Sequence, residues 1–122
     1  MKLRIRDNTI RIRLTQGEVA RLAAGQSVWQ ETNFGADQRL AIFVDAMDHL
    51  GQIFAGFEDN QIRVGIPLPA ARDWANGEQI SLEATQPVGC EKALHILIEK
   101  DFQCLHSAAE GEEDAYPNPR NK

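Results

Sequence analysis

The sequence predicts an α+β protein built mainly from antiparallel strands, in which two β-β-α-β-β units form an eight-stranded barrel or a strongly curved sheet with two helices. Short segments in which apolar and polar residues alternate predict strands with one buried face. Segments 7–12 and 59–64 are alike in sequence and lie 52 positions apart. Residues 1–52 and 53–104 are therefore interpreted as pseudo-repeats.

The first predicted element is a β-hairpin within residues 3–14. Asp7 and Asn8 tolerate the positive φ angles that a two-residue hairpin turn requires. With the turn at these two residues, Leu3 lies opposite Ile12, so apolar side chains meet across the hairpin. This agreement supports the register.

Two short helices are predicted. Thr15 and Glu18 have the spacing of a capping box, in which each side chain bonds to the backbone N–H of the other residue. Gly25 is a favourable end for this helix, because glycine adopts positive φ without strain. The second helix is expected to start near the prolines at 67 and 69, to include Trp74 and to end at Gly77.

Alternation predicts six further strands, and the Asp59-Asn60 pair predicts a second hairpin turn between two of them. The six segments are 28–34, 40–47, 53–57, 62–66, 80–85 and 93–99. Together these elements form a single domain, residues 1–106. Residues 107–122 form an acidic tail with proline and asparagine. Its charge predicts that it folds back over the basic N-terminal hairpin.

Composition limits the functional classes. The chain has 122 residues, of which 43% are hydrophobic, which is enough for one core. Its net charge of −5 argues against general nucleic-acid binding. Two cysteines are too few for a secreted disulfide framework, and the sequence contains neither a signal-like nor a membrane-spanning apolar stretch. We therefore expect a cytoplasmic protein without membrane contact, either a monomer or a homodimer.

Positive charge is concentrated at the N-terminus, where the predicted hairpin places Arg4 opposite Arg11 and Lys2 opposite Arg13. Like charges that face each other across a strand pair are destabilising. Arginine side chains bind phosphate and carboxylate groups with two parallel hydrogen bonds. Lys2, Arg4, Arg11 and Arg13 are therefore the candidate anion-binding residues. The alternative is a solvated face, or one that is neutralised by carboxylates of other strands.

Three glutamates, Glu31, Glu83 and Glu99, are candidate metal ligands. Carboxylates beside arginines can hold Mg²⁺ on a phosphorylated substrate. Salt bridges with the same arginines are the alternative explanation for these glutamates. Mg²⁺ is expected only under this phosphohydrolase alternative, and no cofactor is expected for a binding module.

Three segments resemble a family of small uncharacterised bacterial proteins, namely KLRIRDNTIRIRLT at 2–15, LIEKDFQCL at 97–105 and YPNP at 116–119. A weaker resemblance, in the basic strand that begins at Leu3, is to the CYTH-like triphosphate tunnel proteins. That resemblance implies a duplicated, eight-stranded barrel whose channel is lined by charged residues. The Glu-x-Glu-x-Lys metal motif of that family is replaced here by KLRIR at residues 2–6.

The leading hypothesis is a small, non-enzymatic binding module that recognises an anionic ligand or an acidic partner segment through the basic hairpin. The first alternative is a metal-dependent phosphohydrolase of the tunnel type, in which the arginines hold phosphates and the glutamates hold Mg²⁺. The second is a structural or interaction protein that associates through the apolar strand residues Phe43, Met47 and Phe54. Arginines and carboxylates that converge inside a cavity would favour the enzyme, and an open basic face would favour the module.

Overall fold

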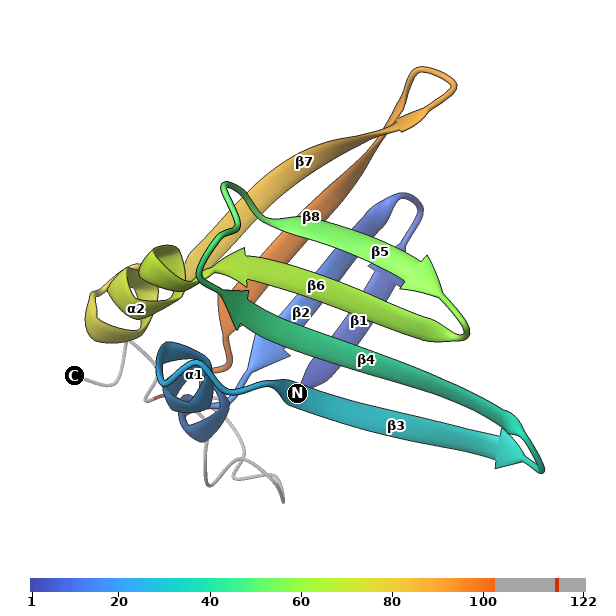
Figure 1. Cartoon of the computed structure of the whole chain (residues 1–122), viewed down its shortest axis with the longest axis horizontal. Coiled ribbons are helices and arrows are strands. Elements are labelled where there is room, and N and C mark those ends of the chain that lie inside the picture. The colour runs from blue at the N-terminus through green and yellow to red at the C-terminus, as the bar shows by residue number, and fades with distance from the viewer. Residues whose placement is uncertain (103–115, 117–122) are drawn as a thin grey trace.

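The computed structural model of the chain describes residues 1–102 and Tyr116, and it shows an α+β protein with eight strands and two helices (Figure 1). The strands are β1 (Lys2–Arg6), β2 (Thr9–Leu14), β3 (Val28–Gly35), β4 (Gln38–Met47), β5 (Phe54–Glu58), β6 (Gln61–Pro67), β7 (Ser81–Gly89) and β8 (Lys92–Lys100). The helices are α1 (Gln16–Ala23) and α2 (Leu68–Asn76). Each element predicted from the sequence is present, although β7 continues to Gly89 instead of ending at residue 85.

The strands form two four-stranded sheets instead of one closed barrel. Sheet A has the strand order β1-β2-β8-β7, and sheet B has the order β3-β4-β6-β5. Each sheet joins one antiparallel hairpin from each half of the chain through a central parallel pair, β2 with β8 or β4 with β6. The predicted barrel is therefore wrong, and the antiparallel prediction holds only within the four hairpins. Alternation identifies the buried face of a strand but not the distant strand that lies beside it.

The two sheets pack against each other through their inner faces, and one continuous core contains residues from both. Ile12 and Ile98 of sheet A and Val64 of sheet B are fully buried. Both helices lie at the same end of the sheets (Figure 1), where the buried side chains of Leu22 and Trp74 close the core. The opposite end, which carries the hairpin turns, has no helix over it in the described part of the chain.

The predicted local signals are confirmed, with one exception at Asn8. The backbone φ is +48° at Asp7, +52° at Asp59 and +61° at Asn60, whereas Asn8 does not adopt the expected positive φ. Both hairpins have the predicted register. The Thr15 hydroxyl accepts a hydrogen bond from the Glu18 N–H at 3.3 Å, and the Glu18 carboxylate accepts one from the Thr15 N–H at 2.9 Å. Gly25 follows α1 with a φ of +81°. Within the described residues, neither helix has the length and apolar composition needed to cross a membrane.

The two halves of the chain have the same order of elements, but their spacing changes along the chain. The registers of β1–β2 and β5–β6 correspond with an offset of 52. Gly35 and Gly89 both have positive φ and both follow a register shift, yet they lie 54 positions apart. The offset of 52 that relates the pseudo-repeats 1–52 and 53–104 therefore does not hold after α2, where buried Val28 corresponds to buried Leu82. The duplication itself stays a prediction.

A single side chain links the edges of the two sheets along one side. Gln86 of β7 accepts a hydrogen bond from the Ala55 N–H through Oε1 at 2.8 Å, and its Nε2 donates to the Ala55 carbonyl at 2.8 Å. The side-chain amide therefore provides the partners that a neighbouring strand would offer to Ala55 at the edge of sheet B. This pair of bonds holds sheets A and B together where no shared strand ladder joins them.

The chain returns to the core at Tyr116. The Tyr116 N–H donates a hydrogen bond to the Asp101 carbonyl at 2.6 Å, and its ring centroid lies 5.5 Å from that of Phe102 and 5.3 Å from the Lys100 ammonium. Because Lys100 also donates to the Gly77 carbonyl just beyond α2, these contacts lie at the helix end of the molecule. The acidic residues 110–114 of the tail lie outside the described residues, so their predicted contact with the basic hairpin stays a prediction.

Candidate functional site

The outer face of the β1–β2 hairpin carries the predicted cationic residues. Leu3, Ile10 and Ile12 face the core, so the residues between them face outward. The confirmed register places Arg4 opposite Arg11 and Lys2 opposite Arg13. We call Lys2, Arg4, Arg11 and Arg13 the basic cluster.

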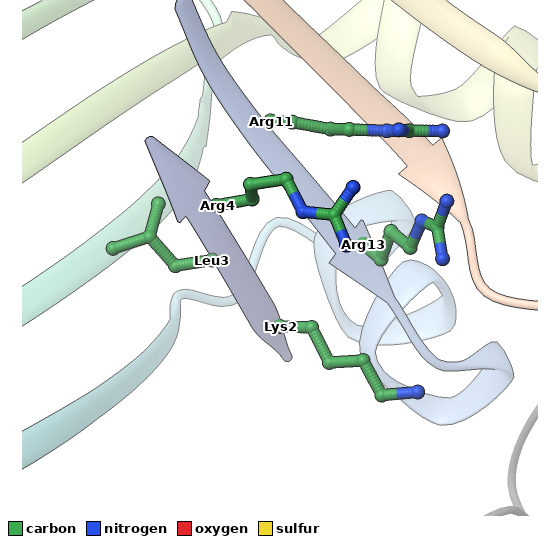
Figure 2. Close-up of a pocket in the computed structure, with 5 residues that line it drawn as sticks. All are labelled: Lys2, Leu3, Arg4, Arg11 and Arg13. Atoms are coloured by element: carbon green, nitrogen blue, oxygen red, sulfur yellow. The ribbon is translucent and has the colours of Figure 1, made fainter. Parts of the chain in front are cut away.

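The four side chains of the basic cluster line a common depression of about 130 Å³. Figure 2 shows them extending to the same side of the hairpin, while Leu3 points to the other side. The depression is open to solvent at the surface of sheet A and does not lie inside a barrel. The charged channel implied by the tunnel resemblance is therefore absent from the described residues, because the space between the sheets is occupied by the apolar core and by a mainly apolar hollow at the hairpin end.

Glu99 of β8 lies beside the cluster and bonds to two of its arginines. Its Oε1 accepts a hydrogen bond from Nε of Arg11 and a longer one, at 3.5 Å, from Nε of Arg13. Burial by itself raises the pKa of Glu99, but the Arg11 hydrogen bond and the charges of Arg11 and Arg13 outweigh it, so the pKa lies below its usual value. The same hydrogen bond raises the pKa of Arg11. Glu99 therefore stays ionised and orients both guanidinium groups.

Replacing Glu99 with glutamine is expected to lower the free energy of unfolding at neutral pH by up to about 1 kcal/mol, because both arginines are a third or more exposed. A carboxylate whose pKa is depressed by folding stabilises the protein above the unfolded-state pKa, and that stability is lost as the pH falls through the folded-state pKa. The wild-type protein should therefore lose stability more steeply than Glu99→Gln below about pH 4.3. Urea denaturation across this pH range checks the prediction, and parallel curves for the two proteins would contradict it.

The remaining two cations differ in their partners. The Lys2 ammonium lies 3.2 Å from Asp101 but is 62% exposed, so this pair is weak. Arg4 is exposed and forms no ion pair with any residue of the described chain. Arg6, which was not among the predicted residues, shares the outer face of β1 with Arg4, and the alternation that identified Arg4 also identifies it. The cluster therefore retains uncompensated positive charge centred on Arg4.

The three candidate metal ligands are not brought together. Glu31 lies on β3 of sheet B, where Arg39 approaches it at 3.5 Å, whereas Glu83 and Glu99 lie on sheet A. The outer faces of two packed sheets point in opposite directions, which separates Glu31 from the other two. In residues 1–102 and Tyr116, no three acidic, histidine or cysteine side chains are grouped so that they could hold a metal ion.

The predicted apolar interaction face is on sheet B and is partly covered by its own neighbours. Phe43 lies between the Trp29 ring, whose centroid is 5.9 Å away, and the Arg63 guanidinium, which is 4.2 Å from the Phe43 ring centroid. Phe54 packs so closely on Gly65 that a Cβ there would lie 2.5 Å from its ring. Met47 is 44% exposed. This face therefore combines local ring contacts with apolar side chains that are exposed, among them Trp29 and Phe54.

One feature was not predicted from the sequence. A hollow of about 540 Å³ lies between the sheets at the hairpin end, and apolar side chains from several strands line it. Alternation marks these residues as inward-facing, but it cannot show that the core stops short of them. The packing of the two sheets is needed to reveal the hollow.

Comparisons with known proteins give one family and no functional relative. A search of curated proteins and a search of solved structures each found no match. A family model described as a family of unknown function, DUF7009, matches residues 1–120. Since this match covers nearly the whole chain, the protein belongs to the family of unknown function DUF7009.

Proposed function

We propose that the protein is a small binding module that recognises an anionic group through the basic cluster on the outer face of sheet A. The observation that carries this proposal is the common depression lined by Lys2, Arg4, Arg11 and Arg13. Its size suits a single phosphate or carboxylate group better than a large ligand.

The arrangement of charge supports an anion as the missing partner. Arg4 faces Arg11 and Lys2 faces Arg13 across the strand pair, and such like-charge pairs are destabilising. Two carboxylates lie beside the four cations: Asp101 contacts Lys2, and Glu99 contacts Nε of Arg11 and of Arg13. Both arginines contact Glu99 through Nε. Their terminal guanidinium nitrogens can therefore bind oxygen atoms of a ligand.

Binding is favoured over hydrolysis by the chemistry of the same residues. Lysine and arginine side chains donate hydrogen bonds and stabilise negative charge, but they accept no proton at neutral pH. Glu99, the neighbouring carboxylate, is held by two arginines with a depressed pKa, which makes it a poor general base. The cluster can therefore hold an anion, and it offers no group suited to activating a nucleophile.

The test is thermal stability at matched ionic strength with phosphate, pyrophosphate, triphosphate or a glutamate-rich peptide, each with and without Mg²⁺. An anion at about tenfold its Kd should raise the free energy of unfolding by about 1.4 kcal/mol. Arg4→Gln should abolish the shift, because it removes the cation that has no ion pair. Arg21→Gln, at an exposed position of α1, is the matched control and should leave the shift unchanged.

Each outcome has one meaning. A shift with phosphates alone identifies a phosphorylated small molecule as the ligand, and a shift with the peptide identifies an acidic partner segment. A shift that requires Mg²⁺ would favour the phosphohydrolase alternative. Equal losses in Arg4→Gln and Arg21→Gln, or no shift with any anion, would overturn the proposed site.

A further inference from the structure

The end of the molecule opposite the helices leaves inward-facing apolar residues uncovered. Figure 1 shows both helices at one end and the turns of the hairpins reaching away from them. On the inner faces of β1, β5 and β7, Ile5 is 57% exposed, Phe57 is 69% exposed and Val88 is 49% exposed. Such positions are core positions in a closed sandwich. Here the core ends before it reaches them.

These exposed residues line the hollow of about 540 Å³ between the sheets. Its deeper wall includes the core residues Ile10 and Ile62 and the partly buried Leu94. The volume lies in the range of small-molecule sites, about 300–1,000 Å³. A concave apolar surface of this size is unfavourable in water and is typical of a binding site.

The polar groups at the hollow include one charged side chain, that of the exposed residue Asp7. The Asn8 amide donates to the Ala93 carbonyl at 2.8 Å, and the Gln86 amide is engaged by both backbone groups of Ala55. Asp7 is the only charged residue among those that line the hollow, and its carboxylate forms no ion pair with any described residue. The hollow therefore presents apolar walls and one free negative charge.

The one described residue of the tail, Tyr116, lies away from the hollow. Residues 103–115 connect Phe102 to Tyr116, two residues that form a bridge at the helix end of the molecule. Leu94, which lines the hollow, lies on β8 eight residues before Phe102, and eight residues of extended chain span about 26 Å.

A second copy of the chain also fits poorly. Two hollows that meet across a twofold axis leave a larger space instead of filling either one, since neither presents a convex surface. The same arrangement would bring the free Asp7 carboxylates of both copies towards each other. A separate small molecule with one positive charge would match both the apolar walls and the Asp7 carboxylate.

We infer that the hollow at the hairpin end binds a small amphiphile that has an apolar body and one cationic amine. The apolar body would lie between Ile10, Ile62 and Leu94, and the amine would pair with Asp7. This site is distinct from the basic cluster, which lies on an outer face and carries the opposite charge. The inference does not depend on the proposed anion site.

The experiment is isothermal titration of the full chain with decylamine, decanol and decanoate below their aggregation concentrations. Decylamine is expected to bind at least tenfold more tightly than decanoate, with decanol between them. Asp7→Asn should weaken decylamine binding about tenfold and leave decanol binding unchanged. Asparagine tolerates the φ of +48° at this position, so the variant should fold.

A second pair of variants tests the apolar walls. Phe57→Gln should weaken the binding of all three compounds several-fold, because it removes a wall of the hollow. Ile80→Gln is the control, since Ile80 is 46% exposed but is not among the residues that line the hollow. Absence of decylamine binding, equal binding of decylamine and decanoate, or equal effects of Phe57→Gln and Ile80→Gln would each overturn the inference. Self-association that Phe57→Gln abolishes, without ligand binding, would assign the hollow to a second copy and overturn it as well.

Discussion

Replacing Trp74 with alanine is expected to lower the free energy of unfolding by about 3–5 kcal/mol. Trp74 is fully buried in α2 at the helix end of the core, and its Nε1 donates a hydrogen bond to the Ile80 carbonyl at 3.1 Å. The substitution removes the indole, leaves a cavity and takes one of two hydrogen bonds from that carbonyl, which keeps the Lys100 N–H as a donor at 3.0 Å. A domain of this size is stabilised by about 5–15 kcal/mol in total, so the loss is a large fraction. Urea denaturation followed by circular dichroism measures it.

The matched control for this prediction is Trp29→Ala. Trp29 is 58% exposed on the outer face of sheet B and stacks on Phe43, so its removal should cost less than about 1.5 kcal/mol. Trp74→Phe retains most of the buried volume and should be intermediate, which keeps the comparison informative if the alanine variant does not fold. Similar losses for Trp29→Ala and Trp74→Ala would show that Trp74 does not close the core.

The second large effect is expected at the link between the sheets. Gln86→Leu should lower the free energy of unfolding by about 2–4 kcal/mol, because the N–H and the carbonyl of buried Ala55 both lose their partner. Leucine retains the size of the side chain, so the loss reports hydrogen bonding more than packing. Thermal and urea denaturation of the variant measure the effect.

Gln79→Leu provides the comparison for Gln86→Leu. The Gln79 amide is exposed and donates only to the nearby Ser81 carbonyl, so its removal should cost less than about 0.5 kcal/mol. Gln86→Glu adds a further check, since its carboxylate can accept from the Ala55 N–H but cannot donate to the Ala55 carbonyl. A loss for Gln86→Leu as small as that for Gln79→Leu would mean that the sheets are held together by the core alone.

Local structure in this protein follows from residues that are close in the sequence. Asp7-Asn8 and the later Asp59-Asn60 adopt the predicted hairpin turns, and the Thr15–Glu18 capping box starts α1. These features depend on backbone angles and on hydrogen bonds across a few residues. For the same reason the outward direction of Arg4 and its neighbours was predictable, because the hairpin register sets it.

The long-range pairing was not predictable in the same way. Nothing in the alternation of β2 indicates that it pairs with β8 in parallel, which brings Glu99 to Arg11 and Arg13. The sequence suggested such neutralisation but could not choose among several carboxylates. The strands after α2 also lie 54 positions from the strands in the same place in the first half, instead of 52, and no local signal marks this change.

Neighbouring residues in the chain predicted the elements, their buried faces, two of the turns and the four cations on one face of the first hairpin. The division of the strands into two sheets, the separation of Glu31 from Glu99 and the open hollow beside Asp7 are visible only in the folded molecule. Turn geometry and alternation act between residues that are near neighbours in the chain, whereas strand order and cavities depend on how separate surfaces fill space against one another.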